Sequence, residues 1–186
     1  MLPLKNAKLN KSRVFVEVVT KTDAASQTEA LQAVIRERDP KVQFVARPQD
    51  ATVALVLVRP NDYADANAGS ATLNADTGID VQRIKDIEKA VPTVLAVNAV
   101  QPWILDKIEP GARATIATFD VNTSALWDVI RGKFAPQGKL PLTMPKNQAA
   151  VDNNAPRCSG LRGDVRLRLH RYRGSQVHLR LRADLR

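Results

Sequence analysis

Short apolar runs alternate with amphipathic stretches along most of this chain. The most continuous run is Ala51–Val58, in which Thr52 is the single polar residue. Such a run is typical of a parallel strand that is buried on both faces. Other runs, rich in β-branched residues, predict four more strands, at Arg13–Val19, Val42–Val45, Thr93–Val97 and Ala112–Phe119.

The amphipathic stretches between these runs predict the helices. Thr22–Asp39 carries apolar residues at helical spacing, and either Asp23 or Ser26 can cap its first turn. Asn61–Asp76 is rich in Asn, Asp, Gly and Ser without a visible period, which predicts a loop. Three later helices are predicted, at Thr77–Ala90, Pro102–Ile108 and Ser124–Arg131. Strands that alternate with helices in this way indicate an α/β fold, with a mostly parallel sheet of five to six strands and helices on both faces.

Composition fits one globular domain with an aliphatic core. The chain has 186 residues, of which 44% are hydrophobic and 4% are aromatic. No apolar run approaches the roughly 20 residues that a membrane span needs, so we expect no membrane partner. The single cysteine, Cys158, excludes an internal disulfide and a cysteine-based metal cluster. We expect neither a metal nor a cofactor, because no glycine-rich phosphate loop follows a predicted strand.

The net charge of +9 belongs to one end of the chain. Residues 156–186, here called the tail, hold nine Arg and two Asp, a net charge of +7. The preceding residues hold 19 Lys and Arg against 17 Asp and Glu, a net charge of +2. Arg alternates with aliphatic residues in the tail, which is typical of a basic amphipathic strand or of an arm that binds nucleic acid or a membrane surface. Because the body is nearly neutral, no nucleic-acid partner is expected.

A segment rich in proline follows the last predicted helix. Gly132 can end that helix, and Pro136, Pro141 and Pro145 exclude both helix and central strand. The whole segment reads GKFAPQGKLPLTMP. It resembles the segment that closes the core of the second domain in family 3 glycoside hydrolases, the β-glucosidase and β-xylosidase family.

Three other short stretches of the chain resemble the same domain, in the same order. Leu2–Leu4 is similar to the sequence that opens it. Val91–Val94 and Gln101–Trp103 are similar to one of its strands and the helix after it. The resemblance implies that residues 1–155 form a three-layer αβα sandwich.

The resemblance also implies where sugar chemistry occurs. Retaining glycosidases need two carboxyl groups about 5 Å apart. In the family the nucleophile is an aspartate on a preceding barrel domain, so no catalytic residue is expected in this chain. Some members contribute an acid/base glutamate or sugar contacts from the loop that matches Asn61–Asp76, which contains no Glu here. Asp62 and Asp65 are therefore the candidate substrate-binding residues, because α/β sites cluster past the carboxyl ends of parallel strands. The alternative is that both are solvated loop carboxylates.

Other chemistry-bearing residues have structural interpretations. Trp103 and Trp127 fit helical faces, so core packing is favoured over a sugar platform. Asp120 follows a predicted strand, where turn or capping chemistry explains it. His170 and His178 lie in the tail, and no metal or general-base role is expected of either.

We interpret the tail as frameshifted or disordered. Codons for Ser175–Arg186 can be chosen so that reading one nucleotide later gives PKSTYGFGLTY, whose last seven residues resemble the aromatic-glycine motif that ends the family domain. The arginines would then not have been selected for a partner. The final strand of the sandwich would be missing or replaced, leaving a sheet edge uncovered.

The predicted function is that of the C-terminal domain of a β-glucosidase-like glycoside hydrolase. It would pack on a catalytic barrel and help to form the sugar site, while the isolated chain would be inactive. A glucoside or oligosaccharide is the expected partner, reached through the barrel, and the parent would hydrolyse terminal β-D-glucosidic bonds. Two alternatives are a stand-alone carbohydrate-binding module and a nucleic-acid binder that uses the tail. The sequence leaves the compartment open, and a periplasmic or secreted parent fits the resemblance.

Overall fold

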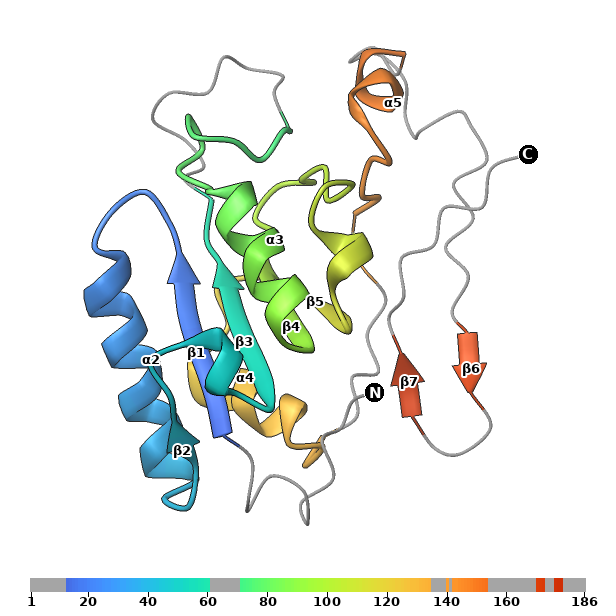
Figure 1. Ribbon diagram of the computed structural model, residues 1–186. Coiled ribbons are helices and arrows are strands. Elements are labelled where there is room, and N and C mark those ends of the chain that lie inside the picture. Colours follow the sequence, from blue (N-terminus) through green and yellow to red (C-terminus); the bar gives the residue numbers. More distant parts are fainter. Residues whose placement is uncertain are drawn as a thin grey trace.

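A five-stranded parallel sheet forms the centre of the protein (Figure 1). The computed structural model describes residues 13–60, 71–134, 140, 142–153, 170–172 and 176–178. The strands follow the order β2–β1–β3–β4–β5 across the sheet. Their bounds are β1 Arg13–Val19, β2 Gln43–Phe44, β3 Val53–Val58, β4 Thr93–Asn98 and β5 Ala114–Thr118. The predicted α/β fold is confirmed, and each predicted strand is present: β1 has its predicted bounds, β4 is one residue longer, and the other three are shorter.

Helices cover both faces of the sheet, as expected for an αβα sandwich (Figure 1). α2 and α4 lie on one face and α3 on the other. The helical bounds are α2 Ala24–Arg38, α3 Val81–Ala90, α4 Thr123–Ile130 and α5 Gln148–Asp152, with 3-10 turns η1 Pro48–Asp50 and η2 Glu109–Gly111. None of the helices in the described ranges has the length and apolar character that a membrane span requires.

Two aliphatic cores result from the alternation of side chains along the strands. In β3, Ala54 and Val56 face α3, whereas Val53 and Leu55 face α2 and α4. Ile84 and Ile87 of α3 are fully buried in the first core. The second core takes its helical side chains from α2 and α4, namely Leu31, Ile35, Leu126, Trp127 and Ile130.

The start of α2 differs from the prediction in its capping. Asp23 occupies the N-cap position, but its left-handed φ of 53° leaves its side chain without a capping hydrogen bond. Thr28 instead fixes the helix, because its hydroxyl donates to the Ala24 carbonyl and accepts from the Val18 amide. That second bond, 2.9 Å long, ties α2 to β1.

The predicted helix at Pro102–Ile108 is wrong. This stretch is irregular, and the 3-10 turn η2 begins only after it. Trp103, Ile104 and Leu105 are all buried. A surface helix buries only one of its faces, and three consecutive residues do not lie on one face of a helix. Ile104 forms a parallel bridge with Thr72, and the chain then turns at residues 106–108, where the Ile108 amide donates to the Leu105 carbonyl.

Glycine is required where α4 ends. Gly132 has φ 75°, and its amide donates to the Val129 carbonyl while the Lys133 amide donates to the Asp128 carbonyl. This pattern is a Schellman motif, which satisfies the carbonyls at a helix end. The predicted C-cap role of Gly132 is confirmed.

The proline-rich segment runs from the end of α4 to the opposite end of the sheet. Leu140, Leu142 and Met144 contact the core on the α3 side, and Met144 is 6% exposed. α5 follows, and the Thr72 hydroxyl donates to the Gln148 side chain over 3.1 Å. Figure 1 places α5 beyond the carboxyl ends of the strands. Residues 135–139 and Pro141 lie outside the described residues, so the prediction from Pro136 and Pro141 stays a prediction.

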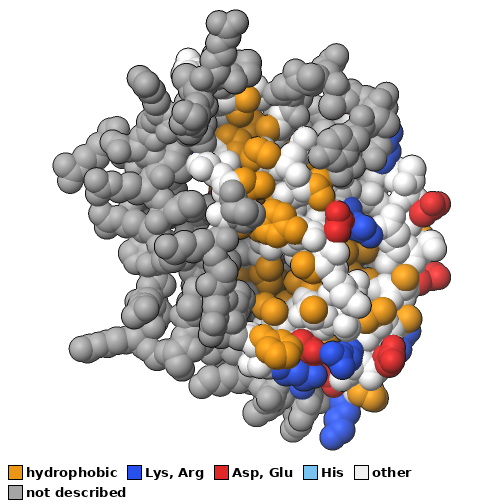
Figure 2. Space-filling model, turned by 180° about the vertical axis from the view of Figure 1, so that it is seen from behind, with side chains coloured by type: hydrophobic (Ala, Val, Ile, Leu, Met, Phe, Trp, Pro, Cys, Tyr) orange, Lys and Arg blue, Asp and Glu red, His pale blue; other side chains and the backbone are white. Residues whose placement is uncertain are grey.

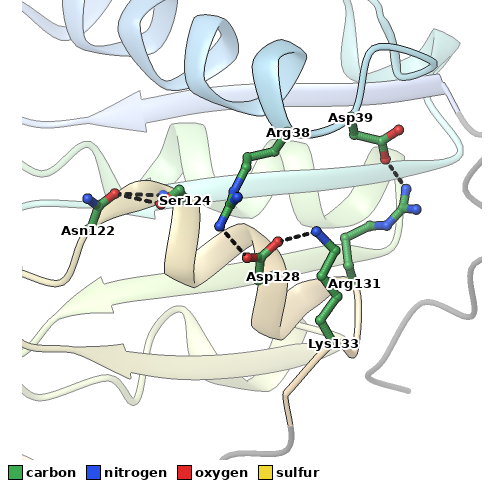
Figure 3. A network of polar contacts seen from close by, with 7 residues as sticks. All are labelled: Arg38, Asp39, Asn122, Ser124, Asp128, Arg131 and Lys133. Atoms are coloured by element: carbon green, nitrogen blue, oxygen red, sulfur yellow. Dashed lines mark hydrogen bonds and ion pairs between the residues drawn. The ribbon is translucent and has the colours of Figure 1, made fainter.

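A polar network around the buried Asp128 joins α2 to α4 near the amino ends of the strands (Figure 3). Asp128 accepts from the Arg38 guanidinium and from the Lys133 ammonium, both over 2.7 Å. Arg131 pairs with Asp39 beside it. The Lys133 hydrogen bond and the Arg38 charge hold the pKa of the Asp128 carboxyl below its ordinary value, against the opposing effect of burial.

Two short strands are described in the tail. β6 His170–Tyr172 pairs in antiparallel fashion with β7 Gln176–His178. The boundary at residue 155 and the frameshift interpretation of the tail stay predictions, because most of the tail lies outside the described residues.

Candidate functional site

The carboxyl ends of β3, β4 and β5 meet around a small hollow of about 80 Å³. Parallel strands bring the residues just past their carboxyl ends to one end of the sheet, where α/β proteins place their ligands. We call this end of the sheet the rim. The hollow is lined by Leu57, Arg59, Asn98, Thr118, Asp120, Val121, Thr123 and Leu126.

Asp120 is held on the rim by Asn98. The Asn98 amide nitrogen donates to Asp120 Oδ1 over 2.8 Å, and Asn98 Oδ1 accepts from the Asp120 backbone amide over 3.1 Å. Asp120 adopts φ 50°, a left-handed conformation that aspartate and asparagine tolerate better than most residues. The Asp120 side chain is nevertheless 64% exposed. The turn thus presents a fixed carboxylate to solvent.

Asn98 is itself held by the core beneath the rim. It is the last residue of β4 and is 8% exposed. Its backbone carbonyl accepts from the Trp103 indole over 3.1 Å. Trp103 is fully buried, which confirms its predicted place in the core. Its hydrogen bond also supports the backbone of Asn98 from below. The position of Asp120 therefore depends on the interior packing.

Arg59 supplies the positive charge of the rim. Its amide continues the sheet by donating to the Val19 carbonyl, which fixes the backbone at the end of β3. Its guanidinium donates to the Gln27 side chain over 3.1 Å and lies 3.9 Å from Asp120 Oδ1. Arg59 is 45% exposed, so it can also contact a ligand.

The rim combines groups that suit a polyhydroxylated ligand. Carboxylate and amide oxygens accept hydrogen bonds from hydroxyl groups, and guanidinium and amide nitrogens donate to them. Within the described ranges, no three His, Cys, Asp or Glu side chains come together as a metal site would require. The hollow has room for several water molecules, so hydroxyl groups of a ligand can enter it.

The predicted sugar residues belong to the loop beside this rim. Asp62 and Asp65 lie outside the described residues, so their contact with a sugar stays a prediction. The loop leaves the end of β3 after Pro60. It returns at Ala71, whose carbonyl accepts from the Ile104 amide over 2.8 Å. Both ends of the loop are therefore anchored in described structure.

Other singled-out residues have structural roles. Trp127 is 2% exposed and lies in the second core, as predicted. The Ser124 hydroxyl donates to Asn122, which caps α4. Asp120 is a turn residue, as expected, although Asn122 and not Asp120 caps the helix. His170 and His178 lie in β6 and β7, and their side chains are outside the described part of the chain.

Sequence reasoning missed Arg59 and Asn98. Each stands at the end of a buried apolar strand, one residue after Val58 or Val97. Asp62 and Asp65 became candidates by the same criterion, a polar residue just past the end of a predicted strand. Applying it to the end of every predicted strand would have found both residues.

Comparison with known families gives one model that spans most of the chain. The model described as "Glycosyl hydrolase family 3 C-terminal domain" matches residues 5–175. The match begins before β1 and ends inside the tail.

Two curated relatives carry the name β-glucosidase C, one of them as probable. The chain is 33% identical over 115 residues to "Probable beta-glucosidase C" of Aspergillus oryzae, which covers 58% of this chain and 18% of that protein. It is 29% identical over 92 residues to "Beta-glucosidase C" of Emericella nidulans, covering 50% of this chain and 14% of that protein. The chain therefore spans less than a fifth of the length of these relatives.

Solved structures share the fold. A β-glucosidase from Listeria innocua, solved with isofagomine, aligns with a TM-score of 0.61 and 15% identity, over 81% of this chain and 25% of that one. β-Glucosidase 3B from Thermotoga neapolitana, solved with glycerol, aligns with a TM-score of 0.53 and 14% identity, over 80% and 28% of the two chains. At these identities the likeness concerns the fold alone.

Proposed function

Because this chain belongs to the glycosyl hydrolase family 3 C-terminal domain family, we propose that it serves as the sugar-site-completing domain of a β-glucosidase. The chain covers a small part of its relatives, so the parent activity is part of the proposal. In it, the parent hydrolyses terminal β-D-glucosidic bonds, and this domain packs on a catalytic barrel that supplies the nucleophile. The isolated chain is then inactive.

The rim is the observation that carries this proposal. Asp120, Asn98 and Arg59 come from the ends of three neighbouring strands, and two of the three side chains are about half exposed or more. The Asp62 and Asp65 loop begins at the same edge, one residue after Pro60. A sugar that reaches the rim would meet acceptors and donors held by buried structure, which lowers the entropy lost on binding.

Titration of the full chain with glucose, followed by amide NMR shifts, tests the proposal. We expect weak saturable binding, with shifts concentrated at Arg59, Asn98, Asp120 and the loop from residue 61 to 70. Asp120→Ala should weaken binding by about tenfold, because it removes a hydrogen-bonded carboxylate. Asp86→Ala is the matched control, since Asp86 is 55% exposed on α3, away from the rim. Shifts spread over other surfaces, or binding unchanged by Asp120→Ala, would refute the role of the rim.

A further inference from the structure

Arg59 and Asp120 face each other on the rim without forming a hydrogen bond. Arg59 Nη2 lies 3.9 Å from Asp120 Oδ1, which is beyond hydrogen-bond distance. Each side chain is held from another direction. Arg59 Nη1 donates to the Gln27 side chain over 3.1 Å. Asp120 Oδ1 accepts from the Asn98 amide over 2.8 Å. Contacts with Gln27 and Asn98 therefore set the gap between the two charged groups.

Both groups keep hydrogen-bonding capacity for a ligand. Within the described part of the chain, neither Asp120 Oδ2 nor Arg59 Nη2 makes a hydrogen bond. A carboxylate oxygen accepts hydrogen bonds and a guanidinium nitrogen donates them. Both side chains reach solvent. The rim thus offers one acceptor beside one donor, separated by a gap that another molecule can bridge.

The pair carries no net charge, which restricts the chemistry of its ligand. An anion between the two groups would be repelled by Asp120, and a cation would be repelled by Arg59. Figure 2 shows the same character on the face behind the sheet, where acidic and basic side chains lie next to one another rather than in separate fields of one sign. The pair suits a neutral ligand that donates one hydrogen bond and accepts another at neighbouring atoms.

We propose that Asp120 and Arg59 bind two hydroxyl groups on neighbouring carbons of a sugar, a vicinal diol. One hydroxyl donates to Asp120 Oδ2, and the next accepts from Arg59 Nη2. Hydroxyl groups on neighbouring ring carbons are close enough to reach both side chains at once. This inference rests on the proposed function, because it names the part of the sugar that the rim recognises.

Two linked hydroxyl groups have an advantage over a single one. A single hydroxyl can bridge the pair, but water does the same, so one hydroxyl gains little over the water that it displaces. Two hydroxyls on one ring displace two waters, and the second contact forms without the loss of freedom of a second molecule. Both contacts are charge-assisted and therefore stronger than hydrogen bonds between neutral groups. The diol, and not the number of hydroxyls, should decide affinity.

Methyl β-D-glucoside and its deoxy analogues can separate these contributions. The methyl group blocks the hydroxyl on the first ring carbon. The vicinal pairs that remain are those on the second and third carbons and on the third and fourth carbons. Removal of the hydroxyl on the third carbon destroys both pairs, whereas removal of the hydroxyl on the sixth carbon destroys neither. The two analogues have the same number of hydroxyls and differ in the presence of a vicinal diol.

Amide NMR titration of the full chain measures the affinities, followed at Arg59, Asn98 and Asp120. We expect the 3-deoxy analogue to bind about tenfold more weakly than methyl β-D-glucoside, because the two charge-assisted contacts can no longer form together. The 6-deoxy analogue should bind like the parent glucoside. N-methylacetamide, which offers one donor and one acceptor, should give no saturable shift at these residues.

Two variants assign the preference to the pair. Asp120→Asn removes the carboxylate and Arg59→Met removes the guanidinium, and each retains a side chain of similar length. In either variant the 3-deoxy and 6-deoxy analogues should bind equally. Asp86→Asn and Lys89→Met are the matched controls, since these residues form an exposed pair on α3 with a separation of 3.7 Å. Both controls should keep the preference for the 6-deoxy analogue.

The outcomes distinguish this inference from the proposed function. Equal binding of the two deoxy analogues at the rim of the unmodified chain would overturn the vicinal-diol inference and leave sugar binding at the rim intact. A preference that persists in both Asp120→Asn and Arg59→Met would overturn it as well. Saturable shifts with N-methylacetamide at the same residues would show that the pair recognises an amide instead. No saturable shift with methyl β-D-glucoside would refute sugar binding at the rim, and the inference with it.

Discussion

The two ends of the parallel sheet use the same side-chain types in opposite ways. At the amino ends, Asp128 is 5% exposed and is neutralised by Arg38 and Lys133 (Figure 3). At the carboxyl ends, Asp120 is fixed by Asn98 yet remains 64% exposed. Buried ion pairs hold elements together, whereas an exposed, prearranged carboxylate can exchange water for a ligand. Burial, and not residue type, therefore separates the structural end of this domain from its candidate functional end.

Removing the buried carboxylate should produce the largest loss of stability. Asp128→Ala deletes two charge-assisted hydrogen bonds that join α4 to α2 and to Lys133. We expect the free energy of unfolding to fall by about 2 kcal/mol, less than for a fully buried pair because both cations stay almost half exposed to water. Urea unfolding measures this change, with exposed Asp86→Ala as the control. A loss below about 0.5 kcal/mol would mean that the network does not stabilise the fold.

Acid should reduce the stability that Asp128 contributes at the same end of the molecule. The pKa of Asp128 is lowered in the folded protein, so its stabilising contribution is complete above the unfolded-state value of about 4. The contribution is lost as the pH falls through the lowered folded-state pKa, because protonation ends the ion pairs. Urea midpoints between pH 5 and pH 2 should fall less steeply in Asp128→Ala than in the unmodified protein. If the urea midpoints of the two proteins fell equally with pH, the Asp128 ion pairs would not be the source of the acid sensitivity.

Glu88 shows how burial shifts the pKa of a half-buried carboxyl. Burial raises the pKa of Glu88 to about 7, although the charge of Lys85 opposes the shift. Its Oε1 is buried without a hydrogen bond, and a Cβ on Gly111 would lie 2.3 Å from its Oε2. The folded state thus favours the protonated form, so stability should decrease as the pH rises from about 4.3 to about 7 and stay low above that.

Glu88→Gln should remove that pH dependence. We expect it to stabilise the protein by about 1 kcal/mol at pH 8, less than the whole pKa shift implies because the half-buried carboxyl is partly screened by water. At pH 4 it should have little effect. Thermal melts at the two pH values measure the difference, and equal effects at both would show that the Glu88 carboxyl titrates as it does in water.

The smallest effect on stability is expected at the rim. Asp120→Ala breaks a partly buried hydrogen bond with Asn98 and an exposed ion pair with Arg59, so the free energy of unfolding should change by about 1 kcal/mol or less. The same substitution should reduce glucose binding, as described above. A loss of stability as large as that of Asp128→Ala would make Asp120 a structural residue and remove the contrast between the two ends.

Strand positions could be predicted because apolar β-branched runs can be buried in few other ways. β3 and β4 lie within two residues of their predicted bounds for this reason. The helix predicted at Pro102 was wrong because proline also begins irregular segments, and three adjacent buried residues needed contacts that are distant in sequence. α5 is too short to show a helical period, so nothing local predicts it.

The candidate site was predictable in place but not in detail. The rule that ligands gather past parallel strand ends points to the end of the sheet where the rim lies, and sugar binding there stays a prediction. It did not identify the pairing of Asn98 with Asp120, since 22 residues separate them and only the β4–β5 register brings them together. A contact between side chains on neighbouring strands depends on register, which composition does not encode.

The most direct test of the central claim is the release of 4-nitrophenol from 4-nitrophenyl β-D-glucoside. The assay compares the purified chain alone with the same chain mixed with the catalytic barrel of a family 3 β-glucosidase. The account predicts no release by the chain alone and release from the mixture that falls at least about tenfold in Asp120→Ala. Release by the chain alone would contradict the account, because the reacting carboxyl pair would then lie within these 186 residues.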